Sequence, residues 1–141
     1  MAKRRSAKRG WQTPGTRCLH VDVLWYRSPG LDPETVLGRI HQVVAGARAR
    51  VVVAQTAFEA DADDNEDRTR PFSDLLIEAA DPGAVWAGLR ALLDDPGIGP
   101  GLRRSASICC DVPNRNWGIV DRSQVLLLYH HDPSEPLDRF R

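Results

Sequence analysis

The fold follows from the sequence RCLHVDVLWY at residues 17–26. Apolar and polar side chains alternate along it, with Leu19, Val21, Val23 and Trp25 in one set and Cys18, His20 and Asp22 in the other. Successive side chains of a β-strand point to opposite faces, so a period of two predicts a strand with one buried face. We expect this strand at the centre of a sheet, with helices on its apolar side and its polar side open or covered by a partner.

Two helices are predicted from the way they begin. Asp32-Pro33 and Asp81-Pro82 each place an N-cap aspartate before a proline that suits the first helical turn. Apolar residues then recur at helical spacing up to Ala47 and Leu93. Runs of β-branched and apolar residues predict the remaining strands, and glycine-rich stretches predict the loops. We expect strands at 50–59, 71–79, 105–110 and 124–131, a loop at 97–101 and a turn at 114–118.

This order of elements predicts an α+β domain with a ferredoxin-like two-layer sandwich. The sheet would be mostly antiparallel, with two helices on one face and an extra strand from a C-terminal hairpin. The first strand would be central, flanked by the third strand and by one of the two C-terminal strands. We expect a basic flexible tail at 1–16, a single domain at 17–133 and an irregular C-terminal tail at 134–141.

Composition favours an ordinary soluble protein. The chain has 141 residues, of which 42% are hydrophobic and 27% charged, as is typical of one globular domain. No apolar run approaches the ~20 residues that span a bilayer, and the N-terminus lacks the apolar core of a secretory signal. Three cysteines without CxxC spacing favour a reducing compartment. We therefore expect a cytoplasmic protein that contacts no membrane and needs no cofactor.

The net charge of zero hides an uneven distribution. Five of the first ten residues are basic, which leaves 14 basic against 19 acidic residues in the remainder, a net charge of −5. Clustered Lys and Arg release counterions from phosphates, so the tail is a candidate nucleic-acid contact. A solubilising terminus, or a peptide that folds back on the acidic body, is the favoured explanation, because an acidic body repels DNA; nucleic-acid binding is the less favoured alternative. The candidate nucleic-acid residues are Lys3, Arg4, Arg5, Lys8 and Arg9.

The polar side of the predicted sheet is the first candidate site. Imidazole and carboxylate groups there could perform acid–base catalysis (His20, Asp22, Glu78, His131) or bind a metal (His20, Asp22, Asp74). However, residues on one strand face lie about 7 Å apart, and the chain has no HExxH, P-loop or GxGxxG motif. We therefore favour a non-catalytic polar face that is solvated or binds a protein, including a second copy of this chain.

Residues 59–67 are the second candidate site, because they carry six carboxylates. They do not match an EF-hand, since Glu66 and Phe72 replace its glycine and final glutamate. A solvated hairpin tip explains them, but an acidic loop would also attract a basic partner. The leading hypothesis is a small interaction protein, such as an inhibitor, immunity-type neutraliser or adaptor, that binds a basic protein partner. Its predicted partner-binding residues are Asp61, Asp63, Asp64, Glu66 and Asp67, with Trp117 as an exposed aromatic anchor.

Overall fold

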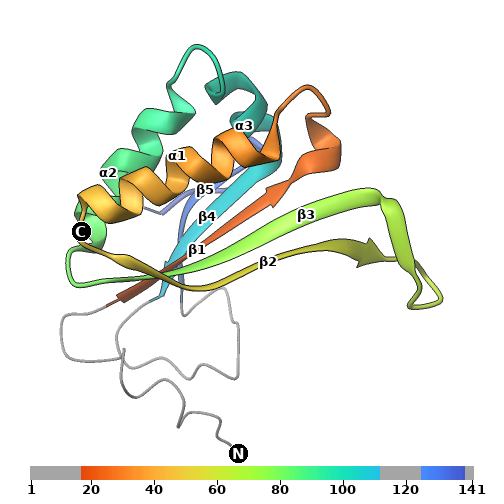
Figure 1. Ribbon diagram of the computed structural model, residues 1–141, viewed down its shortest axis with the longest axis horizontal. Coiled ribbons are helices and arrows are strands. Elements are labelled where there is room, and N and C mark those ends of the chain that lie inside the picture. The colour runs from red at the N-terminus through yellow and green to blue at the C-terminus, as the bar shows by residue number, and fades with distance from the viewer. Residues whose placement is uncertain (1–16, 112–124, 139–141) are drawn as a thin grey trace, which may run out of the picture.

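The computed structural model of the chain describes residues 17–111 and 125–138. They form a five-stranded antiparallel sheet in the order β2-β3-β1-β4-β5, with the α-helices on one face (Figure 1). The predicted α+β class and mostly antiparallel sheet are confirmed. The elements are β1 (Arg17–Leu24), the 3-10 turn η2 (Trp25–Arg27), α1 (Pro33–Gly46), β2 (Arg50–Ala60), β3 (Glu66–Ala79), α2 (Pro82–Leu93), α3 (Gly99–Ser105), β4 (Ala106–Asp111) and β5 (Val125–His130).

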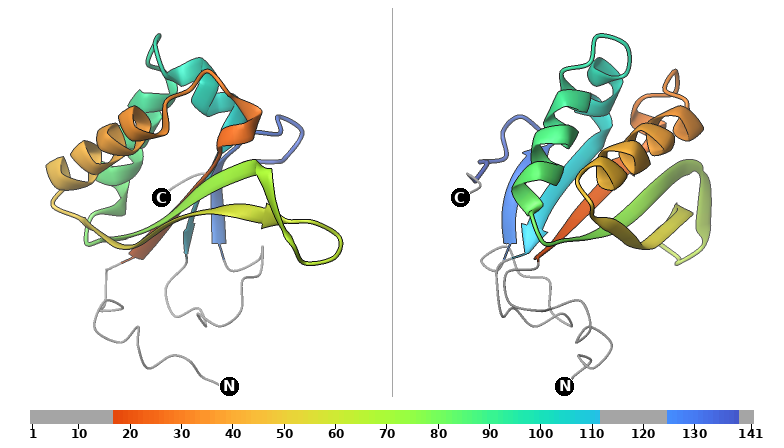
Figure 2. Two further views of the ribbon diagram at one scale, coloured as in Figure 1. Left: turned by 45° about the vertical axis from the view of Figure 1, so that its right-hand side comes forward. Right: turned by 60° about the vertical axis from the view of Figure 1, so that its left-hand side comes forward.

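Strand β1 is central, as its alternating sequence predicts. It pairs with β3 on one side and with β4 on the other, so β4 is the C-terminal strand that lies beside it. Leu19, Val21 and Val23 are at most 2% exposed, and they face the helix layer that covers one side of the sheet (Figure 2). Strand β5 adds an edge beyond β4. The five-strand order and the third helix depart from a plain ferredoxin-like sandwich, which has four strands and two helices.

The two predicted helix starts are confirmed. The Asp32 carboxylate accepts the Thr35 N–H at 3.1 Å, and the Asp81 carboxylate accepts the Ala84 N–H at 3.1 Å. Both helices bury the apolar stripe that their spacing predicts. The buried residues are Val36, Ile40 and Val44 in α1, and Val85, Leu89, Leu92 and Leu93 in α2.

Helix α3 was not expected, because its start lies in the predicted glycine-rich loop at 97–101. The prediction of a loop is wrong because these glycines allow neighbouring elements to pack closely. A Cβ at Gly99 would lie 2.4 Å from the Leu93 carbonyl oxygen, and one at Gly101 would lie 3.0 Å from Leu31 Cδ1. The missing side chains let α3 approach the end of α2 and the chain before α1.

Strand β3 begins at Glu66, five residues before the predicted start at 71. The β2–β3 ladder continues to Ala60↔Glu66, and Arg70 of β3 pairs with Glu59 of β2 at 3.0 Å. Pro71 is tolerated inside the strand because β1 ends its pairing one residue away, at Leu24↔Phe72. The acidic loop therefore shrinks to residues 61–65, at the tip of a hairpin that projects past the helices (Figure 1).

Strand β5 is only partly buried, although most of its residues are apolar. Only Leu127 and Leu128 are buried, because β5 is an edge strand that pairs with β4 alone among the described strands. All three cysteines are free thiols. Across 17–111 and 125–138, no helix combines the length and apolarity needed to cross a membrane.

Candidate functional site

The side of the sheet that faces away from the helices is the candidate site, and we call it the open face. Residues paired across antiparallel strands share a face, so the registers define its members. Helices α1, α2 and α3 all lie on the other side (Figure 2). The open face consists of Cys18, His20, Asp22 and Leu24 of β1, Phe72, Asp74, Leu76 and Glu78 of β3, Val53, Gln55 and Ala57 of β2, and Ser107 and Cys109 of β4.

Two carboxylates stand side by side on this face. Asp22 of β1 is the direct cross-strand partner of Asp74 of β3. The Gln55 side-chain amide donates to Asp74 at 3.3 Å. Within the described residues, no lysine or arginine forms an ion pair with either carboxylate. The pair therefore retains its mutual repulsion in the free protein.

An open hollow of ≈ 350 Å³ lies over this pair. Leu24 and Phe72 give the hollow an apolar wall, and Glu59 and Ser107 complete its lining. Burial raises the pKa of Asp74, because a carboxylate loses water when apolar groups surround it. Half-buried acidic groups beside apolar side chains provide a good site for the charged head and aliphatic stem of a lysine or arginine.

Glu59 differs from the other two carboxylates because side chains of the same chain already offset its negative charge. Arg70 pairs with one of its oxygens at 3.0 Å, and the Tyr26 hydroxyl donates to the other at 3.1 Å. The Arg70 guanidinium also lies over the Tyr26 ring, 4.8 Å from its centroid. Glu59 therefore belongs to a local cluster, and the uncompensated charge of the hollow comes from Asp22 and Asp74.

The residues predicted for acid–base or metal chemistry are only partly brought together. The register places His20, Asp22, Asp74 and Glu78 on the open face in three successive rows. The Glu78 carboxylate forms an ion pair with Arg50 at 2.8 Å. In the described parts of the chain, no three His, Cys, Asp or Glu side chains are grouped so that they could hold a metal ion. The metal and acid–base roles remain predictions.

Cys18 and His131 differ from their predicted settings. Cys18 lies on the polar side of β1 but is 0% exposed, and its backbone N–H donates to the buried Asp111 carboxylate at 2.8 Å. His131 follows the last residue of β5 and lines a different hollow from the Asp22–Asp74 pair. It is His130 that pairs with Ser107 beside the open face. The catalytic role of His131 therefore stays a prediction, and the register favours His130 as the terminal histidine nearer to His20.

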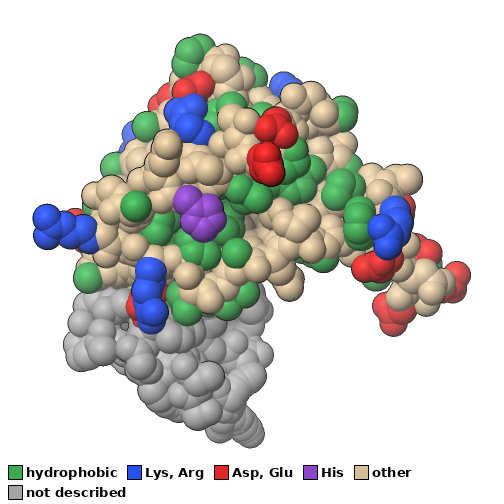
Figure 3. Space-filling view, viewed as in Figure 1, with side chains coloured by type: hydrophobic (Ala, Val, Ile, Leu, Met, Phe, Trp, Pro, Cys, Tyr) green, Lys and Arg blue, Asp and Glu red, His purple; other side chains and the backbone are tan. Residues whose placement is uncertain are grey.

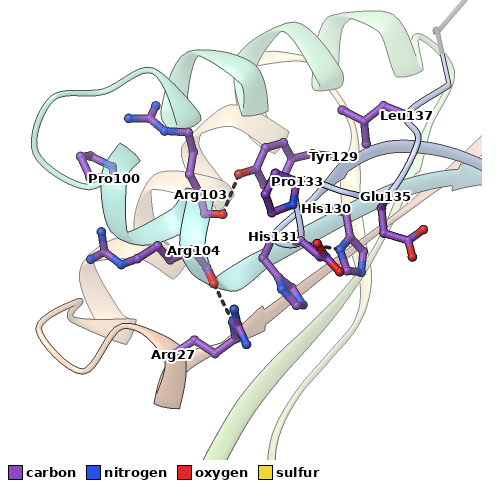
Figure 4. A pocket seen from close by; sticks show the side chains of 11 residues that line it. Arg27, Pro100, Arg103, Arg104, Tyr129, His130, His131, Pro133, Glu135 and Leu137 are labelled. Atoms are coloured by element: carbon purple, nitrogen blue, oxygen red, sulfur yellow. Dashed lines mark hydrogen bonds between the residues drawn. The ribbon is translucent and has the colours of Figure 1, made fainter.

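The hollow that contains His131 has a volume of ≈ 690 Å³ and lies between α3 and the end of β5 (Figure 4). Burial, chiefly, lowers the pKa of His131, and the neighbouring His130 and Arg27 lower it further. Two other side chains of this hollow bind the C-terminal end of α3. Arg27 Nε donates to the Arg104 carbonyl at 2.8 Å, and the Tyr129 hydroxyl donates to the Arg103 carbonyl at 2.6 Å. We assign these contacts a structural role.

The acidic hairpin tip contains two kinds of carboxylate. Asp61 accepts the N–H groups of Asp63 at 2.9 Å and Asn65 at 3.0 Å, and so stabilises the turn. Asp67 accepts both the N–H and the hydroxyl of Thr69, which lowers its pKa. Glu66 lies 3.8 Å from Arg68. Among the acidic residues at 61–67, only Asp63 and Asp64 have a carboxylate for which the described structure shows no hydrogen bond or ion pair.

The remaining predicted residues lie outside the described part of the chain. They are Trp117 and the basic residues Lys3, Arg4, Arg5, Lys8 and Arg9. Compared with models of protein families, with curated proteins and with solved structures, the chain matches none.

Proposed function

We propose that this protein is a non-catalytic interaction module that binds a cationic segment of a protein partner on its open face. The observation that carries the proposal is the Asp22–Asp74 pair, two adjacent carboxylates beside an apolar wall that form no ion pair with any cation of the described residues. An arginine or lysine of the partner would remove their repulsion, and its stem would cover Leu24 and Phe72. Inhibitors, immunity-type neutralisers and adaptors are small proteins that act through such a surface.

The hairpin tip supports the same proposal through its charge. Acidic side chains gather at the tip, which extends away from the helices (Figure 3). Asp63 and Asp64 are exposed there and available to an approaching partner. Charges in this position accelerate encounter with a basic protein more than they increase final affinity. We therefore assign steering to the tip and binding to the open face.

The architecture fits a binding role. We infer that β1–β4 with α1 and α2 form a ferredoxin-like unit to which β5 and α3 are additions. In support, β1 and β2 are joined through α1 and separated by one antiparallel strand, and β3 and β4 are joined through α2 and α3 and separated by β1. This arrangement places the described helices on one face of the sheet, and we propose that a partner binds the other face. Three free thiols favour a cytoplasmic setting.

An oligo-arginine peptide is a suitable probe of the open face. We expect its addition to shift the backbone amide NMR signals of Asp22, Leu24, Phe72 and Asp74. The double variant Asp22→Asn/Asp74→Asn should abolish these shifts, because both charges are removed at constant side-chain size. The control Asp63→Asn/Asp64→Asn removes the same charge from the tip and should preserve the shifts. Equal shifts in wild type and in the Asp22/Asp74 variant would refute the proposal.

A further inference from the structure

We propose that two copies of this chain pair antiparallel through the free edge of β2, so that their sheets join into one. Strand β2 is the last strand of the sheet order and pairs only with β3 among the described strands. Its outer backbone N–H and C=O groups are therefore available to another strand. This surface lies at the sheet edge and shares Glu59 with the lining of the Asp22–Asp74 hollow.

The middle of this edge lacks the features that usually protect free strands. Natural edges carry charges, prolines or bulges that discourage pairing. Residues 51–58 include no charged residue and no proline. The pairing of β2 with β3 shifts register near the two ends of the strand, between Val51 and Val53 and between Phe58 and Ala60, and it is regular between these points. Val53 is 51% exposed, one of two exposed large hydrophobic side chains in the described structure.

The charges at the strand ends select the occupant and its direction. Arg50 precedes the uncharged run and Glu59 follows it. Within the chain, Arg50 pairs with Glu78 and Glu59 pairs with Arg70, and both Arg50 and Glu59 lie on the side of the open face. An antiparallel copy brings Arg50 of each chain beside Glu59 of the other, at both ends. A parallel copy would place like charges together, which is unfavourable. The strand is thus complementary to itself about a two-fold axis.

Apolar surface beside the edge supports the same pairing. A groove of ≈ 120 Å³ runs between α1 and β2, and Leu37, His41, Ala54 and Thr56 are among its lining residues. Hydrophobic side chains gather between these two elements (Figure 3). A strand added to β2 would lie beside this groove and cover apolar surface on both copies, in addition to forming backbone hydrogen bonds.

Sedimentation equilibrium on the full chain tests the association. We expect a monomer–dimer equilibrium in the wild type. Val53→Lys, which introduces a typical edge-protecting residue, should raise the dimer Kd by about tenfold or more, since it occurs twice in the interface. Leu137→Lys is the matched control, because Leu137 is also 51% exposed and lies after β5; it should leave Kd unchanged. A wild type that stays monomeric, or a Val53→Lys chain that dimerises as the wild type does, would overturn the proposal.

Cross-linking tests the direction. Gln55 lies near the proposed two-fold axis, so two copies of Gln55→Cys should be bridged by a short bis-maleimide. Ala60→Cys should not be bridged, because antiparallel pairing separates the two positions by roughly 35 Å at ~3.4 Å per residue. Wild type treated identically controls for the native cysteines. Bridging of both variants indicates parallel pairing, and bridging of neither indicates that β2 is not the interface; either result contradicts the proposal.

Discussion

At the scale of single residues, the Asp22–Asp74 pair should lower the stability of the free protein. Like charges directly opposite on antiparallel strands are destabilising, and no described cation compensates these two. We expect Asp74→Asn to increase the free energy of unfolding by roughly 0.2–1 kcal/mol at pH 7, as measured by urea denaturation. Asp63→Asn removes an equal charge from the exposed tip and should change stability less. A destabilised Asp74→Asn protein would mean that the carboxylate has a favourable partner.

The increase in the free energy of unfolding that we expect from Asp74→Asn should depend on pH in a defined direction. Burial raises the pKa of Asp74 in the folded state above its unfolded value of about 3.9. A raised carboxyl pKa means that the folded state holds the proton more tightly, so its contribution to stability is present at low pH and lost as pH rises through the folded pKa. The advantage of Asp74→Asn should therefore be largest at neutral pH and shrink as pH falls towards 4. An advantage independent of pH would show that the ionised Asp74 carboxylate is not its cause.

The residues of this site could be predicted from sequence, but their partners could not. Alternation along β1 is sufficient to place His20 and Asp22 on one face and Leu19 on the other. It does not determine which residue of β3 lies opposite Asp22, because a shift of two residues preserves every face. Cys18 shows a related limit: alternation predicts its face, but not that its backbone N–H donates to Asp111, which is 93 residues away along the chain.

At the scale of elements, local signals predicted what local contacts determine. The Asp-Pro starts of α1 and α2 were predictable because each cap bonds a residue only three positions away. Helix α3 was missed because its glycines respond to contacts with other elements, such as that of Gly99 with Leu93 of α2. A glycine-rich sequence favours a loop unless tertiary packing requires the absence of a side chain.

Two glycine substitutions test this distinction. Gly38 lies in the interior of α1 with nothing within 4 Å of an added Cβ, whereas a Cβ at Gly99 would meet the Leu93 carbonyl oxygen at 2.4 Å. We expect Gly38→Ala to stabilise the protein by about 0.5–1 kcal/mol, since alanine loses less conformational freedom on folding. Gly99→Ala should destabilise it by about 1–3 kcal/mol through overpacking. Both changes are measured by urea denaturation, and effects of the same sign would contradict the packing role of Gly99.

At the scale of the whole molecule, the hairpin tip and the open face are separate surfaces. We expect the tip to control the rate of association with a partner and the open face to control the affinity. Asp63 and Asp64 carry charge without an internal partner, whereas Asp61 and Asp67 hold the turn and its flanking strand. Changing all five acidic residues together would therefore alter the hairpin as well as its charge. A clean test changes only Asp63 and Asp64.

We expect Asp63→Lys/Asp64→Lys to slow the association of an oligo-arginine peptide in stopped flow at low salt. The difference from wild type should diminish as salt shortens the Debye length to about 10 Å at 0.1 M, because screening removes long-range attraction first. Dissociation should change little, since the bound arginine would contact Asp22 and Asp74 instead of the tip. Asp22→Asn/Asp74→Asn should show the converse, with faster dissociation and a smaller effect on association. If the tip variant instead accelerates dissociation and leaves association unchanged, the tip belongs to the binding site and does not act by steering.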